Sequence, residues 1–482
     1  MVRKKPPQSG EPLHPAGFEL HALPDGGLGS LASPPPDLAD DYLAWLHRSP
    51  TPLHAVEQVV ARLEAAGFHA RDLAAALTTE PGERLYVIHP DGKSLIALVV
   101  GQRSPCETGY ALVGSHTDSP DLRLRMNPLA QAAGTVQLTT QFHGGLIRRS
   151  WLDRPLALAG AVYQVLRDKS GAPRFHAVTG QPVVTRHLVR VDAPVAVIPD
   201  LAIHLDREKN DKGAMNPQHW LNAVVGTGDA EPEMVMARLS ALAGVALDRV
   251  DGFDLHLVPY LPPQRVGVDG TLLVGPRHDD LAMVFCGLAA LLASVETEPA
   301  PVRTRAVAFF DAEETGSTTA SGAASNFLRD VLLRVARRHP RTAKGADAEQ
   351  AFAHTFCVSA DMAHALHPNH MEMHDKQHAP RINQGLVIKT NANDRYATTG
   401  QTAAVFTGIC EAANVPVQDF IVRQDLACGT TIGPITAASL AARTVDVGCP
   451  MWAMHSCAET MGAKDLESMV AALRVFFLGG AH

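Results

Sequence analysis

Short apolar runs rich in β-branched residues alternate with helical patterns along most of the chain. Residues 95–100, 111–114, 306–310 and 356–358 have the composition of short buried strands. Residues 52–66, 281–293 and 466–478 carry apolar side chains at helical spacing, and Gly67 follows the first of them as a C-cap. This alternation predicts an α/β fold, built on a doubly wound, mostly parallel sheet with helices on both faces.

The stretch from residue 121 to 262 has a different pattern. It contains a Gly-rich turn at His143-Gly144-Gly145, β-like runs at 183–191 and 195–198, and few long helical patterns before Pro232. We interpret it as a mainly β domain inserted into an α/β domain that comprises residues 39–120 and 263–482. Residues 1–38 are rich in Pro and Gly and predict a poorly ordered tail, and residues 337–350 predict a surface loop.

Composition excludes several classes of protein. A chain of 482 residues exceeds one ordinary core and suggests two or three units. The formal net charge of -8 argues against a general nucleic-acid binder or an electrostatic membrane binder. The longest mainly apolar run, 281–295, is too short to span a bilayer comfortably, so we expect no membrane segment. Seven widely spaced cysteines without a Cys-x-x-Cys pair, and no secretory pattern, predict reduced thiols and a cytoplasmic protein.

Histidines and carboxylates stand at five places where a predicted strand ends or a predicted helix begins. The five places are residues 114–118, 277–281, 310–317, 359–364 and 452–456. Strands of such a sheet end at one edge, where α/β folds bind ligands, so we expect these side chains to lie together. Mixed His and carboxylate ligands suit zinc, with manganese or cobalt possible. Two His and at least three carboxylates are too many for one zinc ion, and predict two ions that share a bridging carboxylate.

Each place also has a plain structural interpretation. His116 could be a buried His bonded to its neighbour, and Asp279 and Asp280 could simply cap the helix that follows them. The acids at 311, 313 and 314 follow a run that reads as an interior strand and have no basic residue among them. They repel one another unless a cation or a proton intervenes, which favours a functional site.

Other chemistries lack support. His370-Met-Glu-Met-His374 does not have the His-Glu-x-x-His spacing, and neither a phosphate-binding loop nor a Gly-x-Ser-x-Gly elbow occurs. Pro368 and Pro380 interrupt the stripe of histidines around this segment, so His367, His370, His374 and His378 are predicted to lie in loops. Cys428 lies in a Gly-rich turn, where a structural role is favoured over a nucleophile.

Eight motifs between residues 114 and 456 resemble the aspartyl aminopeptidase family, and the match runs in the right order from about residue 43 to 478. They are Gly114-Ser-His-Thr-Asp-Ser-Pro120, Trp151-Leu-Asp-Arg154, Leu201-Ala-Ile-His204, Phe310-Asp-Ala-Glu-Glu-Thr-Gly-Ser317, Asp361-Met-Ala-His-Ala-Leu-His-Pro-Asn369, Val387-Ile-Lys389 with Arg395-Tyr-Ala397, Cys428-Gly-Thr-Thr-Ile-Gly-Pro434 and Ala453-Met-His-Ser456. The resemblance implies a cytosolic dinuclear zinc exopeptidase that removes N-terminal acidic residues from peptides. It also implies that the inserted domain mediates dimerisation and that the subunits form dodecamers.

The resemblance further implies a role for individual residues. His116 and Asp361 would hold one metal ion, Glu314 and His455 the other, and Asp279 would bridge the two. Asp118 would orient His116, and Glu313 would be the general base. The implied substrate-binding residues are His364, Lys389 and Tyr396, with His204 reaching in from a partner subunit.

Some positions depart from the family pattern. Asp280 stands where the family often has Asn, and Arg148 and Arg149 stand where aromatic or small residues are common. None of these departures removes an implied ligand. We therefore expect an aminopeptidase specific for N-terminal Asp or Glu. The alternatives are a dinuclear aminopeptidase of neutral or broad specificity and a non-catalytic peptide- or cargo-binding shell; Lys389 and Glu313 respectively argue against them.

Overall fold

The computed structural model describes residues 37–75, 77, 79–212 and 215–479. The predicted tail therefore lies outside the described residues, apart from its last two. Asp37 caps helix α1 (Leu38–His47) by accepting the amide hydrogen of Asp40. The first helix thus begins two residues before the expected start near Asp40, because the capping carboxylate satisfies an otherwise free amide.

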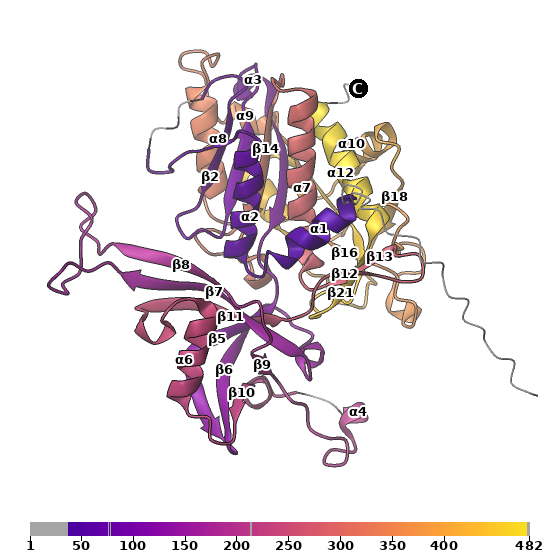
Figure 1. Cartoon of the computed structure of the whole chain (residues 1–482). Helices are drawn as coiled ribbons and strands as arrows, with labels where there is room; N and C mark the ends of the chain where they lie inside the picture. The colour runs from indigo at the N-terminus through magenta and orange to yellow at the C-terminus, as the bar shows by residue number, and fades with distance from the viewer. Residues whose placement is uncertain (1–36, 76, 78, 213–214, 480–482) are drawn as a thin grey trace, which may run out of the picture. The chain divides into compact units, whose positions relative to one another are not determined.

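A nine-stranded sheet forms the framework of the α/β part (Figure 1). Its strands, in spatial order, are β1 (His69–Ala70), β2 (Arg84–Ile88), β3 (Leu95–Val99), β14 (Thr304–Phe310), β4 (Tyr110–His116), β15 (Phe356–Ala360), β19 (Arg443–Gly448), β17 (Leu386–Lys389) and β18 (Val417–Phe420). The four central strands, β14, β4, β15 and β19, are parallel to one another. β2 and β17 each form antiparallel pairs with their inner neighbours, β3 is antiparallel to both of its neighbours, and the sheet is therefore mixed toward its edges.

Helices cover both faces of this sheet. Alternate residues of β3 point to opposite faces, so Leu95 and Val99 join one apolar core and Ile96 joins the other. The first core contains α1, α2 (Pro52–Ala65), α7 (His278–Thr297), α10 (Gly400–Ala412) and α12 (Ala463–Leu478). The second contains α3 (Pro105–Thr108), α8 (Phe327–Arg338), α9 (Gln350–Ala353) and α11 (Ile432–Leu440). The predicted loop at 337–350 is helical at its two ends, where α8 finishes and α9 begins.

Residues 121–259 form a separate seven-stranded antiparallel sheet. Its order is β11 (Gly252–Pro259), β5 (Asp121–Ala132), β6 (Thr135–His143), β10 (Ala223–Thr227), β9 (Ala196–Val197), β7 (Pro155–Val165) and β8 (Val184–Arg190). β11 also pairs with β7, which closes part of the sheet on itself. Helix α6 (Pro232–Ala243) packs Val235 and Leu239 into its core, and the short helices α4 (Lys209–Lys212) and α5 (Pro217–Trp220) lie in the connection between β9 and β10.

A third sheet of five short strands was not predicted. Its order is β12 (Gln264–Val266), β13 (Leu272–Gly275), β21 (Glu459–Gly462), β20 (Pro450–Trp452) and β16 (Ala363–His364). β13 pairs antiparallel with β21, so that Gly275 lies opposite Glu459. The sheet therefore joins the segment just before α7 to the segment just after His455.

Helix α7 is long and apolar enough to cross a membrane by length and composition alone. However, 72% of its most apolar window is buried within the protein. Leu281, Phe285 and Leu288 contribute to the first apolar core. α7 is therefore a core helix of the α/β part, and its apolar character is explained by packing.

Candidate metal centre and peptide pocket

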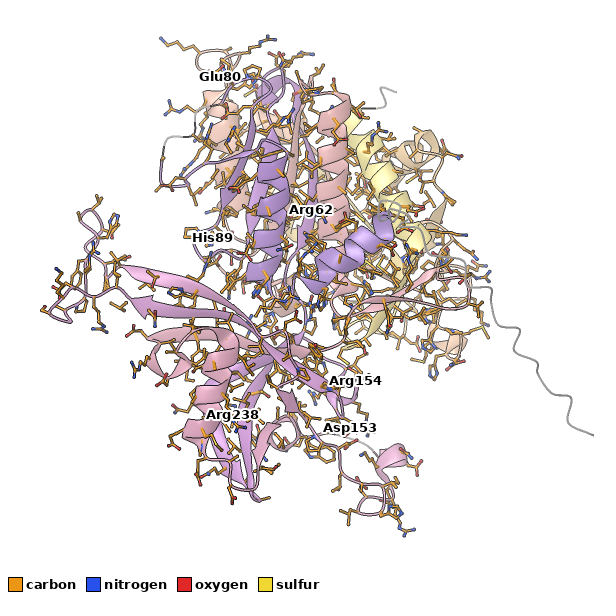
Figure 2. The ribbon with its side chains drawn as sticks, in the orientation of Figure 1. Arg62, Glu80, His89, Asp153, Arg154 and Arg238 are labelled. Carbon is orange, nitrogen blue, oxygen red and sulfur yellow. The ribbon has the colours of Figure 1, made fainter. Side chains whose placement is uncertain are left out.

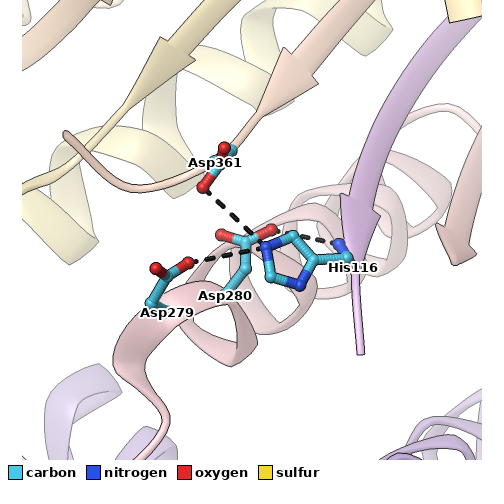
Figure 3. A group of neighbouring side chains, drawn as sticks. All are labelled: His116, Asp279, Asp280 and Asp361. Atoms are coloured by element: carbon cyan, nitrogen blue, oxygen red, sulfur yellow. Dashed lines mark hydrogen bonds and ion pairs between the residues drawn. The ribbon is translucent and has the colours of Figure 1, made fainter. Parts of the chain in front are cut away.

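Five candidate ligands converge at the carboxyl ends of the central parallel strands. β4 ends at His116, β14 leads into Glu314, and β15 leads into Asp361. Asp279 lies in the first turn of α7, and His455 follows β20. Figure 3 shows His116 with Asp279, Asp280 and Asp361 around it. The structure thus brings together side chains from all five places singled out in the sequence.

Asp279 lies between the two imidazoles. Its Oδ1 is 3.5 Å from His116 Nε2, and its Oδ2 is 3.5 Å from His455 Nε2. Asp361 Oδ1 is 3.9 Å from the same atom of His116. Glu314 Oε2 is 3.3 Å from the same atom of His455. The cluster therefore has two halves, each with one His and one further carboxylate, joined through the two oxygens of Asp279.

The donor set fits divalent cations. Asp279 Oδ1 and Glu314 Oε1 are buried, yet neither has a hydrogen-bond partner among the described residues. Burial and the charge of Asp279 raise the pKa values of Glu314 and Asp361. Burial disfavours the charged form of His455, but its contacts with Asp279 and Glu314 raise its pKa to about 12. Such crowded, buried carboxylates need compensating positive charge, which bound metal ions supply.

Glu313 lies beside this cluster and lines the adjoining cavity. Its Oε2 is 3.9 Å from His116 Nε2. Burial, followed by the charges of Asp361 and Glu314, raises the pKa of Glu313 to about 8 although the nearby His116 opposes this shift. A carboxyl group with its pKa near neutrality, facing a cavity, can both accept and return a proton.

Asp118 contacts both His116 and the loop that contains Glu313 and Glu314. Its carboxylate accepts the amide hydrogens of Glu313, at 3.0 Å, and Glu314, at 3.3 Å. Its main-chain oxygen, 3.0 Å from His116 Nδ1, approaches the ring more closely than its carboxylate, at 3.5 Å. His143, at the end of β6, places its Nε2 3.0 Å from Asp118 Oδ2. Asp118 therefore links both segments of the cluster to the inserted sheet.

A cavity of about 370 Å³ opens from the cluster. It is lined by His116, Asp279, Glu313, Glu314, Gly316, Asp361, Met362, Ala363, His364, Lys389, Tyr396, Phe420, Gly429, Thr430, Thr431, Met454 and His455. Three of the four predicted substrate-binding residues, His364, Lys389 and Tyr396, thus share one cavity with the candidate ligands.

Lys389 is only 2% exposed, and its ammonium is held from several sides. Nζ donates to the main-chain oxygens of Asp361, at 3.0 Å, and Met362, at 3.2 Å. It is also 3.4 Å from Asp361 Oδ2 and 5.3 Å from the centre of the Tyr396 ring. Burial favours the neutral amine, but Asp361 and neighbouring carboxylates raise the pKa of Lys389. The cavity therefore contains a fixed positive charge.

His204 lies elsewhere. It is exposed in the connection between β9 and α4, and it is not among the described residues that line the cavity. Leu201, Ile203 and Leu205 around it are also exposed, at 43%, 44% and 75%. A single subunit thus does not bring His204 to the pocket.

Sequence reasoning missed three residues whose contacts orient candidate ligands. Glu459 accepts the amide hydrogens of both Asp279 and His455, at 3.0 and 2.7 Å. The main-chain oxygen of Gly145 is 3.0 Å from His455 Nδ1, and the amide of Ile147 donates to the main-chain oxygen of His455. No spacing rule links Gly145 to His455 across 310 positions, so only the fold could show this contact.

Comparison with known proteins decides the family. Residues 45–477 match the family described as "Aminopeptidase I zinc metalloprotease (M18)". The chain belongs to the M18 family of zinc aminopeptidases. It is 40% identical over 445 residues to a "Probable M18 family aminopeptidase 2" of Pseudomonas fluorescens strain SBW25, covering 91% of this chain and 98% of that protein. The chain is thus a metal-dependent M18 aminopeptidase, and the donor set described above fits the zinc expected of the family.

Solved M18 structures have the same mixed α/β fold. The chain matches the cryo-EM structure of the Ape4 and Nbr1 complex with a TM-score of 0.84 and 33% identity, covering 91% of this chain and 85% of that one. The crystal structure of prApe1 matches with a TM-score of 0.82 and 26% identity, covering 92% and 94%. The dodecamer of S. cerevisiae mApe1, at 24% identity and a TM-score of 0.78 with 92% and 96% coverage, shares the fold.

Proposed function

We propose that this M18 aminopeptidase removes N-terminal Asp or Glu from peptides at a dinuclear metal centre. One observation carries the choice of substrate: the cavity beside the candidate ligands contains the buried ammonium of Lys389. A fixed cation in a partly apolar pocket selects a substrate side chain with a carboxylate. A neutral side chain would leave that charge without a new partner.

Two divalent ions, zinc by preference with cobalt or manganese as substitutes, fit the two halves of the cluster. We assign His116 and Asp361 to one ion, Glu314 and His455 to the other, and Asp279 to both. The assignment is supported by the opposed contacts of Asp279 Oδ1 and Oδ2 with the two imidazoles. When bound, such ions polarise a carbonyl group and make water more acidic.

Glu313 is proposed as the general base. Its carboxylate accepts a proton from the attacking water and then gives that proton to the nitrogen of the departing peptide. Asp118 positions this step, because its carboxylate accepts the amide hydrogen of Glu313. It also fixes the His116 ring through the main-chain oxygen that faces Nδ1.

The remaining side chains orient the substrate. Lys389 would pair with the side-chain carboxylate of the first residue, while Tyr396 and His364 form the adjoining walls. Desolvation at the cavity wall, followed by the charge of Lys389, lowers the pKa of His364, so this imidazole is neutral near pH 7 and can accept a hydrogen bond. We assign His204 to the pocket of a partner subunit, since it is exposed within its own.

This assignment requires an oligomer. We propose that the inserted sheet mediates dimerisation and that the subunits form dodecamers; the structurally similar mApe1 is a dodecamer. The exposed apolar side chains of Leu201, Ile203 and Leu205 support a protein contact at this segment. We propose a cytoplasmic location, which agrees with seven free cysteines, six of them buried. No nucleic-acid or membrane partner is proposed.

Matched peptides test the proposal. Initial hydrolysis rates are measured for an Asp-initiated peptide and its Leu-initiated twin, with zinc or cobalt supplied. A strong preference for Asp is the expected result. A preference for Leu would keep the metallo-aminopeptidase and overturn the acidic specificity. Binding of two metal ions without turnover of either peptide would instead favour a peptide- or cargo-binding shell.

A further inference from the structure

Glu459 joins the main chains of two candidate ligands. It opens β21 and is 1% exposed. Its Oε1 accepts the amide hydrogen of His455 at 2.7 Å, and its Oε2 accepts that of Asp279 at 3.0 Å. Glu459 itself is outside the groups of described side chains that could hold a metal ion. It therefore contacts the main chain of the ligands and leaves their side chains free.

Neither His455 nor Asp279 has the backbone conformation of a regular helix or strand. His455 has a φ of 68°, in the left-handed region that non-Gly residues seldom occupy. Asp279, with φ -83° and ψ 108°, departs from helical geometry inside the first turn of α7. Its amide hydrogen lies at a helix N-terminus, where an outside acceptor is required. Residues held in such conformations depend on the contacts around them.

The third sheet fixes the position of this carboxylate. The pairing of β13 with β21 places Glu459 opposite Gly275, four residues before Asp279. The pairing of β20 with β21 returns the chain from His455 to Glu459. The carboxylate consequently lies between the strand that leads to Asp279 and the turn that carries His455.

We infer that Glu459 is a positioning residue that sets the separation of Asp279 and His455 and thereby retains the metal ion between them. The inference rests on the metal assignment proposed above. His455 Nε2 and Asp279 Oδ2 are 3.5 Å apart, although the two residues are 176 positions apart in sequence. The distance between them therefore depends on a contact that connects both segments. The carboxylate of Glu459 supplies this connection, because each of its two oxygens accepts one of the two amide hydrogens.

A purely structural role would give a different result. If Glu459 only satisfied two buried amides, its loss would destabilise the folded chain and leave the ligand field of the metal unchanged. If it positions the ligands, its loss would weaken and distort one metal site even where the protein is fully folded. Loss of an orienting contact around a metal site typically costs about 10–100-fold in affinity.

Glu459→Gln tests this distinction, with Glu459→Ala as the larger change. Gln has the same shape but only one acceptor oxygen, so one of the two amides loses its partner. Glu467→Gln, at an exposed position of α12, is the matched control. Folding is checked by circular dichroism, zinc affinity by competition with a chelator, and site geometry by the visible spectrum of the cobalt-loaded protein.

We expect Glu459→Gln to fold, to hold one of its two ions about 10–100-fold more weakly, and to show an altered cobalt spectrum. The Glu467→Gln control should match the wild type. Wild-type zinc affinity and an unchanged cobalt spectrum in Glu459→Gln would overturn the inference. Should Glu459→Ala fail to fold, Glu459→Gln decides alone. A wild-type protein that binds fewer than two ions would overturn the dinuclear proposal itself, and this inference with it.

Discussion

Asp279 and His455 meet through Oδ2 and Nε2 at 3.5 Å, while the other carboxylate oxygen of Asp279 faces His116 at the same distance. Each oxygen of one side chain is thus directed at a different imidazole. This arrangement divides the cluster into two halves and leaves Glu313 at its edge, which makes the roles of Glu313 and Glu314 separable by experiment.

Glu313→Gln should retain the metal ions and lose turnover. The amide cannot accept the proton of the attacking water, and loss of a general base typically costs about 10²–10⁴-fold in kcat. Zinc content and kcat are measured on the same preparation. Glu314→Gln is the matched comparison, because it alters an assigned ligand and should lose zinc. Zinc loss in Glu313→Gln itself would refute its role as base.

Lys389→Met should reduce the preference for acidic substrates. Met keeps the length of the side chain but removes the charge, and a charge-assisted hydrogen bond contributes about 1.5–3 kcal/mol, or about 10–100-fold in kcat/KM. The ratio of kcat/KM for Asp- and Leu-initiated peptides isolates this effect, since any disturbance of Asp361 affects both. Lys464→Met, at an exposed position, serves as control. An unchanged ratio would remove Lys389 from substrate selection.

Asp280→Asn should be tolerated. Asp280 Oδ2 accepts the amide hydrogen of His116 at 3.1 Å, and the amide oxygen of Asn can accept the same bond. Asp280→Ala instead leaves that buried amide unpaired, which costs about 1–3 kcal/mol in the free energy of unfolding. Denaturant unfolding and zinc retention distinguish the two variants. Equal damage from both would show that the negative charge itself is needed.

Mixed oligomers should reveal whether His204 acts across a subunit boundary. His204→Ala subunits keep Glu313, and Glu313→Gln subunits keep His204. If the partner subunit's His204 completes each pocket, co-expression should give more activity than the two variants prepared separately. Co-expression of His204→Ala with a variant that carries both His204→Ala and Glu313→Gln should give no such gain. A lack of complementation in the first mixture would place His204 outside the catalytic pocket.

His256 should make stability depend on pH. Its Nδ1 is 2.6 Å from Asp121 Oδ2, and its Nε2 is 3.2 Å from Asp254 Oδ1. Burial opposes the charge, but these carboxylates raise the pKa of His256 from 6.5 to about 9. The stabilisation is therefore present below pH 6.5 and is lost as the pH rises through about 9, with an upper limit of about 3 kcal/mol.

Unfolding free energies at pH 6 and pH 10 test this expectation in the wild type and in His256→Gln. The wild type should lose more stability across this range than the variant does. His187→Gln, at an exposed position of β8, should behave as the wild type. Equal losses in wild type and His256→Gln would exclude His256 as the source.

The proximity of the candidate ligands could be expected from the sequence because parallel strands end at one edge of a sheet. His116 ends such a strand, Glu314 and Asp361 each follow one, and the strand runs could be recognised from their apolar composition. The third sheet could not be recognised, since its strands have two to four residues and pair across long separations. Glu459 was missed for the same reason. The buried position of Lys389 could not be predicted from the sequence either. Its ammonium is held by the main-chain oxygens of Asp361 and Met362, which follow a different strand, β15.

The inserted sheet begins at Asp121 and ends at Pro259, and its first and last strands are neighbours, with His256 opposite Arg123. The insertion therefore begins and ends in two adjacent strands, β5 and β11. Yet the turn after β6 returns to the centre, where Gly145 meets His455 and His143 meets Asp118. A mutation that shifts the inserted sheet would therefore also move the imidazole of His455. The contacts of His143 and Gly145 thus couple the position of the inserted sheet to the geometry of the candidate metal centre.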